Sequence, residues 1–329
     1  MQGVNAMKKL ISIFIALLLL FTVAGCEKKS DVIEIGIIQI IEHAALDAAR
    51  EGFIDALKDN GYEEGKNIKI DYQNAQGDTN NLSTISDRFV SNKVDMVLAI
   101  ATPSAQAIAG KTTTIPILAT AVTDFVTAKL VESDEKPGGN VSGTSDMNPI
   151  EEQLDLMVQL VPDVQTVGVI YNSSEDNSVL QARIVKEIVE GRGLKYVEVT
   201  VSNTNEVQQA VQSIVDKCDA LYLPTDNTIA SAMPTVYSVT VEAKVPTICG
   251  EANMVVNGGL ATLGINYYNL GYQTGLMAID VLKNGKQPKD MPIQKPREFD
   301  FTINGAVAAE IGLEIPEELQ KYVINENNE

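Results

Sequence analysis

The chain has 329 residues, of which 45% are hydrophobic and 21% charged, a composition typical of a globular protein with room for two lobes. It carries 25 Lys and Arg against 44 Asp and Glu, and the formal net charge of −19 disfavours binding to nucleic acid and to anionic lipid head groups. A structural zinc site needs roughly four N or S ligands, and the single His and three Cys are too widely separated in the sequence to favour one, so neither a metal nor a cofactor is expected.

Residues 1–25 have the pattern of a secretory signal peptide. Lys8 and Lys9 precede an apolar run over residues 10–24, which is shorter than the ~20 residues that a membrane span prefers. The run ends in Val23-Ala24-Gly25-Cys26, which resembles a bacterial lipobox. We therefore expect cleavage before Cys26, lipidation of its thiol, and a polar tether over residues 26–31. The alternative is an ordinary signal peptide with an incidental Cys.

From residue 32 onward, apolar β-branched runs alternate with segments whose apolar residues recur at helical spacing. Strands are predicted over residues 32–41, 67–72, 95–101 and 115–122. Helices are predicted over residues 44–60, 79–92 and 103–110.

The same order of elements then returns. Strands are predicted over residues 166–171, 195–201, 220–223 and 245–249, with helices over 178–191, 204–217 and from 227 to 232. Landmarks recur as well, since Val94-Asp95 corresponds to Cys218-Asp219 and Ile115-Pro116 to Val245-Pro246. Strands that alternate with helices imply parallel sheets covered on both faces. The fold class is therefore α/β, with two Rossmann-like lobes joined by hinge strands.

The lobes are expected to exchange chain segments. A turn-rich stretch over residues 137–143 predicts the first crossing, and residues 261–266 predict a second. A helix over 270–283 is expected to return to the first lobe, and the tail from Lys295 to cross again. The N-terminal lobe is thus predicted to comprise residues 32–142 and 267–290, and the C-terminal lobe residues 143–266 and 291–325. Such lobes can close on a ligand.

Candidate ligand contacts follow from this topology, because ligands of open α/β sheets collect beyond the carboxyl ends of the strands. In the first lobe and near the hinge, the polar candidates are Gln39, Glu42, His43, Thr102, Ser104, Thr123, Asp124 and Ser145. In the second lobe they are Tyr171, Asn172, Asn177, Ser178, Asp226, Asn227 and Glu251.

Three of these positions have a specific chemistry and a structural alternative. Thr102-Pro103-Ser104 opens a helix after a strand, where free N–H groups and the helix dipole favour a carboxylate; ordinary capping by Thr102 is the alternative. Asp226, at the equivalent strand end, suits an ammonium group or caps the next helix. Tyr171 and Phe125 could stack on a flat ligand or pack in the core.

Catalytic motifs are missing from the sequence. It has no GxGxxG after a strand, no GxxxxGK[ST], no GxSxG and no HExxH, and no nucleophile and base are paired around the single His43. No catalytic residue is therefore predicted, and a lone His is more often a surface or structural residue. Cys218 and Cys249 could form a disulfide or remain buried thiols.

Several segments together resemble one family. Residues 42–53, 74–78, 101–107, 121–124 and 224–228 are similar, in this order, to the ABC-transporter substrate-binding lipoproteins that include tryptophan- and tyrosine-binding members. The resemblance covers nearly all of residues 32–320, although His43-Ala44 replaces a His-Pro pair. It implies a type I periplasmic-binding-protein fold, an aromatic amino acid ligand (Trp, Tyr or Phe), and docking onto an ABC permease with its ATPase.

The sequence thus predicts an extracytoplasmic solute-binding lipoprotein that is not an enzyme. We expect a monomer held at the cell membrane by its lipid alone, with the ligand carboxylate at Thr102–Ser104 and the ammonium group at Asp226 or Glu251. A nucleoside, a sugar or another small polar solute on the same scaffold is the alternative ligand. An anchored hydrolase or a two-lobe transcriptional regulator would be different classes of protein, and the sequence disfavours both.

Overall fold

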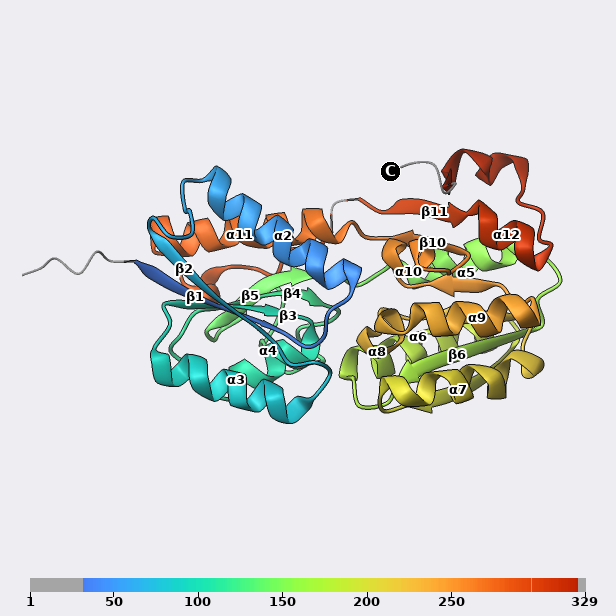
Figure 1. The fold of residues 1–329 in the computed structure, drawn as a ribbon, viewed down its shortest axis with the longest axis horizontal. Helices are drawn as coiled ribbons and strands as arrows, with labels where there is room; N and C mark the ends of the chain where they lie inside the picture. The colour runs from blue at the N-terminus through green and yellow to red at the C-terminus, as the bar shows by residue number, and fades with distance from the viewer. Residues whose placement is uncertain (1–31, 297, 325–329) are drawn as a thin grey trace, which may run out of the picture.

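The computed structural model describes residues 32–296 and 298–324 and consists of two α/β lobes that lie side by side (Figure 1). The predicted signal peptide, the tether and the lipidation site Cys26 lie outside these residues. Within them, no helix combines the length and the apolar character needed to cross a membrane.

The first lobe is built on a five-stranded sheet in the order β2-β1-β3-β4-β5. All neighbouring strands are parallel. The central strands are buried along their whole length, which explains why their sequences are continuous apolar runs rather than alternating ones. The strands are β1 (Ile33–Gln39), β2 (Ile68–Asn74), β3 (Met96–Ile100), β4 (Ile117–Val122) and β5 (Val141–Ser145).

Helices cover both faces of this sheet (Figure 1). On one face, α2 (Ala44–Asp59) packs along α11 (Tyr267–Asn284), which arrives from the far end of the chain. On the other face lie α3 (Thr79–Asn92) and α4 (Thr102–Ala109). The predicted return of the chain to the first lobe is therefore present as α11.

The second lobe repeats the arrangement and extends it. Its seven-stranded sheet has the order β7-β6-β8-β9-β10-β11-β12, whose first five strands match the order of the first lobe. The pairing of β11 with β10 is antiparallel, a departure from the predicted parallel sheets. The strands are β6 (Thr166–Asn172), β7 (Lys195–Val201), β8 (Ala220–Leu223), β9 (Thr247–Cys249), β10 (Ala261–Gly264), β11 (Asp300–Asn304) and β12 (Val323–Ile324).

Two apolar clusters flank the second sheet. One contains α5 (Ile150–Leu160) and α6 (Asp176–Gly191), with α12 (Gly305–Ile311) at its edge. The other contains α7 (Val207–Ile214), α8 (Asn227–Ser231), α9 (Met233–Ala243) and α10 (Ala252–Val256). The predicted helix over 204–217 starts and ends in 3₁₀ turns, η1 (Thr204–Glu206) and η2 (Val215–Lys217); η3 (Pro288–Asp290) and η4 (Glu317–Tyr322) complete the fold. Cys218 and Cys249 are free thiols.

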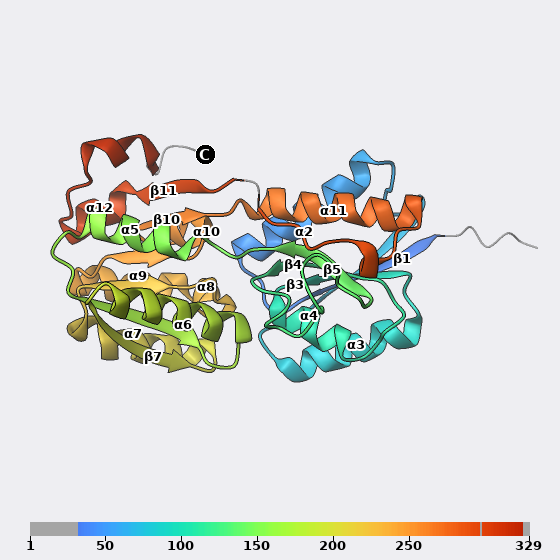
Figure 2. The ribbon, with the colours of Figure 1, turned by 180° about the vertical axis from the view of Figure 1, so that it is seen from behind.

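The chain passes between the lobes at residues 146–149 and 265–266, and again after Gln294 of the first lobe and before Asp300 of the second (Figures 1 and 2). The predicted first crossing over 137–143 is instead the approach to β5, so the boundary at 142/143 falls inside a strand of the first sheet. A glycine is required at position 143 because a Cβ would overlap the backbone of Ala119 on β4. Gly143 therefore allows close packing of the two strands and does not mark a turn. Met291 and Ile293 likewise pack in the first lobe, not the second.

Candidate functional site

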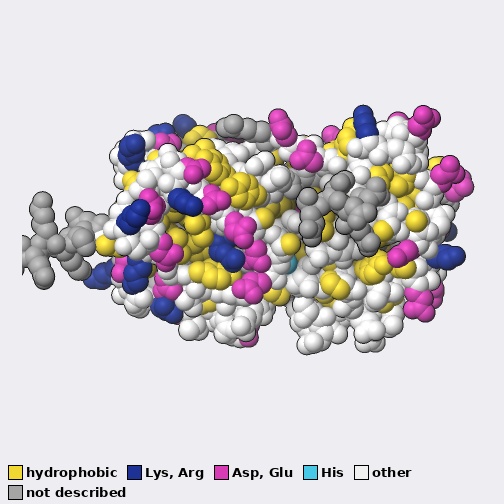
Figure 3. All heavy atoms as spheres, turned by 45° about the horizontal axis from the view of Figure 1, so that its top comes forward, with side chains coloured by type: hydrophobic (Ala, Val, Ile, Leu, Met, Phe, Trp, Pro, Cys, Tyr) yellow, Lys and Arg dark blue, Asp and Glu magenta, His cyan; other side chains and the backbone are white. Residues whose placement is uncertain are grey.

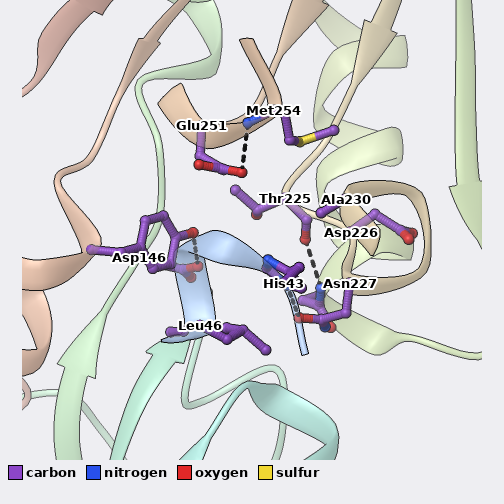
Figure 4. A pocket seen from close by; sticks show the side chains of 12 residues that line it. His43, Leu46, Asp146, Thr225, Asp226, Asn227, Ala230, Glu251 and Met254 are labelled. Atoms are coloured by element: carbon purple, nitrogen blue, oxygen red, sulfur yellow. Dashed lines mark hydrogen bonds between the residues drawn. The ribbon is translucent and has the colours of Figure 1, made fainter. Parts of the chain in front are cut away.

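The carboxyl ends of the two sheets face each other across the gap between the lobes. The space-filling view shows this groove, with acidic side chains along its border on the first lobe (Figure 3). A cavity at the bottom of the groove is lined from both lobes by His43, Leu46, Ala121, Asp146, Asn177, Thr225, Asp226, Asn227, Ala230, Glu251, Met254 and Tyr267 (Figure 4).

The cavity is small, with a volume of about 10 Å³. This is room for about one water molecule. A larger ligand therefore requires the lining side chains or the lobes themselves to move apart.

Two hydrogen bonds join the lobes at the cavity and beside it. His43 caps the start of α2, and its Nε2 lies 3.4 Å from Oδ1 of Asn227 on α8. Burial lowers the pKa of His43 to about 4, so the ring is neutral at pH 7 and its Nε2–H donates to Asn227. Nearby, Nε2 of Gln106 on α4 donates to Oδ2 of Asp176 on α6, at 2.8 Å. The structure is thus the closed form of the two lobes.

Two buried carboxylates of the second lobe organise its side of the cavity. Asp226 caps α8 by accepting from the backbone N–H of Ile229 at 2.8 Å, and it also accepts from the N–H of Asn172 at 2.6 Å. Glu175 accepts from the side chains of Asn227 and Thr228. Burial, and then the charge of Asp226, raise the pKa of Glu175 to about 7, while burial raises the pKa of Asp226.

Two further carboxylates lie towards the crossings. Glu251 caps α10 by accepting from the N–H groups of Asn253 at 2.6 Å and Met254 at 2.9 Å, and burial raises its pKa to about 7. Asp146 accepts from the hydroxyl of Tyr267 at 2.6 Å, and burial raises its pKa as well. Among the described residues, no group of three or more His, Cys, Asp and Glu is placed to hold a metal ion.

Five buried side-chain oxygens have no hydrogen-bond partner within residues 32–296 and 298–324. They are Oγ1 of Thr102, Oγ of Ser104, Oδ1 of Asp146, Oδ1 of Asn148 and Oδ1 of Asn177. Two belong to the start of α4, one to the start of α6 and two to the first crossing. Because buried polar atoms are nearly always satisfied in folded proteins, this concentration around the groove marks positions where a bound molecule would complete the hydrogen bonding.

The predicted site residues fall into three groups. Five of them line the cavity: His43, Asn177, Asp226, Asn227 and Glu251. Another six are buried around the cleft without reaching the cavity surface: Thr102, Ser104, Thr123, Ser145, Asn172 and Ser178. The first two carry unpartnered hydroxyls, and Asn172 donates through its Nδ2 to Thr228 at 2.8 Å.

The remaining four predicted residues have other structural partners. Gln39 donates to Asp47, and Oδ1 of Asp124 accepts from the N–H of Thr127, which stabilises a turn. The exposed Glu42 accepts from the hydroxyl of Tyr72. The Tyr171 hydroxyl lies 3.4 Å from Glu198 on the neighbouring strand β7. Tyr171 is packed beside the second-lobe core and does not line the cavity, so stacking by this ring has no support in the geometry.

Sequence reasoning omitted part of the cavity wall. Leu46, Ala121, Ala230 and Met254 form its apolar part, and a single sequence does not distinguish such residues from ordinary core positions. Three polar residues of the wall, Asp146, Thr225 and Tyr267, are not among the predicted ligand contacts. A signal for two of these existed, because Asp146 and Tyr267 each follow a strand at the point where the chain crosses between lobes.

A closed cleft between two lobes that share the order of five sheet strands defines a ligand-binding protein of the type I periplasmic fold. The family described as ABC transporter substrate binding protein matches residues 34–326, and the chain belongs to that family. Its role is therefore to bind a solute for an ABC transporter.

Similar proteins give more detail. The "Tyrosine-binding protein" of Clostridioides difficile strain R20291 is 49% identical over 270 residues, which cover 82% of this chain and 78% of that protein. The structure of an ABC domain from Streptococcus pneumonia in complex with L-Trp is 40% identical with a TM-score of 0.85, covering 89% of this chain and 99% of that one.

A third relative is informative about conformation. The ligand-free, open structure of a substrate-binding protein with adhesive properties from Clostridium difficile is 46% identical over 89% of this chain and 99% of that one, yet its TM-score is only 0.68. The lower structural similarity at higher sequence identity is expected if the lobes of the present structure are closed, as the hydrogen bonds between them show.

Proposed function

We propose that this protein captures an aromatic amino acid, Tyr, Trp or Phe, between its lobes and delivers it to an ABC importer without chemical change. The observation that carries the proposal is the set of unpartnered oxygens buried on both lobes around one closed cleft. The relatives that are named for tyrosine or solved with L-Trp support the choice of ligand class.

The start of α4 suits the ligand carboxylate. The hydroxyls of Thr102 and Ser104 are buried without partners and can donate to it. The helix N-terminus adds free N–H groups and a favourable dipole. Because α4 faces the start of α6 across the gap, with Gln106 bonded to Asp176, a carboxylate held there lies between the lobes and favours their closure.

The apolar part of the lining suits the aromatic ring. Leu46 and Ala121 come from the first lobe, and Ala230 and Met254 from the second, so the ring would be held from both sides (Figure 4). The thioether of Met254 is a favourable neighbour for an aromatic face or edge. Burial of the ring on opposite lobes would provide the apolar driving force for closure.

We further propose that the protein works outside the cytoplasm as a monomer, anchored through a lipid on Cys26 and partnered by a permease and its ATPase. The lipobox-like Val23–Cys26 and the family membership support this placement. The mass of the membrane-extracted protein would show a diacylglyceryl Cys26 at the N-terminus; an unmodified Met1 or Met7 there would contradict the anchor.

The fluorescence of L-Trp offers a direct binding test, because the chain itself has no Trp. Emission from L-Trp should shift to shorter wavelength on binding, and L-Tyr and L-Phe should reverse the shift by competition, while L-Ala and a sugar should not. After incubation the amino acid should be recovered unchanged. Absence of binding by all three aromatic amino acids, measured by calorimetry on ligand-stripped protein, would refute the proposal.

A further inference from the structure

Asp146 occupies a special place in the fold. It is the first residue after β5, where the chain leaves the first lobe, and its backbone N–H donates to Val122 on β4. Tyr267 opens α11 directly after the second crossing. The third crossing is adjacent too, because the N–H of Ser145 donates to the carbonyl of Gln294. The carboxylate of Asp146 lies in the cavity wall (Figure 4) and is adjacent to these connections between the lobes.

Its hydrogen bonding is incomplete. Oδ2 accepts from the Tyr267 hydroxyl at 2.6 Å, whereas Oδ1 has no hydrogen-bond partner among the described residues. The side chain is only 3% exposed. Burial raises the pKa of Asp146, against smaller lowering effects of the hydrogen bond from Tyr267 and of Thr123. A buried carboxylate of this kind needs a cation.

The other buried carboxylates around the cleft are already satisfied. Both oxygens of Glu251 accept from the N-terminus of α10, and both oxygens of Asp226 accept backbone N–H groups. Glu175 accepts from Asn227 and Thr228 through both of its oxygens. Asp146 is thus the acid among the four that retains an unused oxygen. The described residues that line the cavity include neither Lys nor Arg, so none of them supplies the cation.

We propose that Asp146, held in position by Tyr267, binds the ammonium group of the ligand, and that this contact makes the protein select primary amines over hydroxy- and keto-acid analogues. The inference rests on the proposed function and replaces Asp226 and Glu251 as the ammonium partners. A hydroxyl in place of the ammonium group can still donate a hydrogen bond to Oδ1 but carries no charge. A keto oxygen cannot donate and would leave the carboxylate unpaired.

The experiment compares L-Trp with indole-3-lactate, which keeps the ring and the carboxylate and replaces the ammonium group by a hydroxyl. Both are fluorescent, and the chain contains no Trp. The wild-type protein should prefer L-Trp by roughly 100-fold or more, since a buried charge pair contributes more than a neutral hydrogen bond. In Asp146→Asn, which keeps the size of the side chain, this preference should fall below about tenfold, mainly through weaker binding of L-Trp.

Two further variants keep the result interpretable. Asp216→Asn makes the same chemical change at an exposed position away from the cavity and should retain the wild-type preference. Tyr267→Phe removes only the hydrogen bond to Oδ2 and should weaken L-Trp binding while reducing the preference in part, so it serves if Asp146→Asn does not fold. Thermal unfolding followed by circular dichroism shows which variants are folded.

The outcomes separate the inference from the function on which it rests. If the wild-type protein binds no aromatic amino acid, the proposed function fails. If it binds L-Trp but Asp146→Asn keeps the full preference over indole-3-lactate, or Asp216→Asn abolishes that preference, the assignment of the ammonium group to Asp146 is overturned.

Discussion

Unpaired polar atoms in the cleft oppose the stability of the closed, ligand-free protein. Ser104 is fully buried at the start of α4, and its Oγ has no partner. A buried hydroxyl without a hydrogen bond costs on the order of 1–3 kcal/mol. Its presence is explained if the hydroxyl serves the ligand rather than the fold.

Ser104→Ala should therefore separate stability from binding. We expect the free energy of unfolding to stay the same or to rise by up to about 1–2 kcal/mol, while affinity for L-Trp falls roughly tenfold or more. Urea unfolding and fluorescence titration measure the two effects. Ser86→Ala is the matched control, because the buried Ser86 hydroxyl donates to the carbonyl of Leu82 at 2.7 Å. That variant should lose about 1 kcal/mol and keep its affinity; a similar loss of affinity in both would argue against a role for Ser104.

The buried carboxylates also predict an unusual dependence on pH. The pKa of Glu251 is raised from 4.5 to about 7, so between these values the folded protein holds a proton that the unfolded chain has lost. The contribution of this group to the free energy of unfolding is then present at low pH and is lost as pH rises through about 7. It amounts to at most about 3 kcal/mol.

We expect Glu251→Gln to remove this contribution, so its free energy of unfolding should depend less on pH between 5 and 7 than that of the wild-type protein. His43, whose lowered pKa acts in the opposite direction over part of this range, is common to both proteins and cancels in the difference. Exposed Glu187 on α6 provides the control through Glu187→Gln. Parallel curves for the wild-type protein and Glu251→Gln, measured by urea unfolding at several pH values, would contradict the assignment.

Sequence reasoning placed residues such as His43, Asp226 and Asn227 at the cavity because they follow strand ends, where α/β sheets bind ligands. It did not show which carboxylate oxygens lack a hydrogen-bond partner in the folded protein. Both carboxylate oxygens of Asp226 accept hydrogen bonds from backbone N–H groups, whereas Oδ1 of Asp146 has no partner among the described residues. This difference depends on tertiary hydrogen bonds, which a local sequence pattern does not predict.

At the scale of elements, the helix pair α2 and α11 ties the last part of the chain to the first lobe. Glycines at their contact allow the backbones to touch. A Cβ on Gly271 would overlap the carbonyl of Ala49, and one on Gly52 would overlap the carbonyl of Tyr268. Tyrosines at the edge of the contact add hydrogen bonds, from Tyr268 to Asp55 and from Tyr272 to Asp59.

Gly271→Ala should force these helices apart and destabilise the protein by about 1–3 kcal/mol or more. Gly191→Ala, at the end of α6 with open space around the position, should be neutral within about 0.5 kcal/mol. Thermal unfolding of the two variants checks the contrast. Equal melting temperatures would mean that the contact between α2 and α11 relaxes without cost.

Helices and strands were predicted correctly where residue spacing gave a strong local signal. They were missed where a strand forms only through pairing with a segment distant in the sequence. The bounds of α3 and β7 are those expected from residue spacing. β11 was not predicted as a strand. It follows α11 in the chain and forms a strand by pairing antiparallel with β10, which precedes α11. The first lobe boundary was misplaced for a similar reason, since glycine-rich residues 138–143 resemble a turn but lead into β5.

In the whole molecule, ligand binding requires two rigid lobes that open to admit the ligand and close to bury it. The chain crosses between them near Asp146 and Tyr267, and the hydrogen bonds His43–Asn227 and Gln106–Asp176 hold the closed form. Because the cavity has room for only about one water molecule in this form, exchange of an amino acid demands motion between the lobes.

Small-angle X-ray scattering of ligand-stripped protein, before and after addition of saturating L-Tyr, tests this requirement most directly. The radius of gyration should decrease on addition of L-Tyr, stay unchanged with L-Ala, and stay unchanged in Asp146→Asn at a concentration of L-Tyr that does not saturate that variant. An unchanged radius in wild-type protein that calorimetry shows to be fully occupied by L-Tyr would contradict closure of the lobes on the ligand.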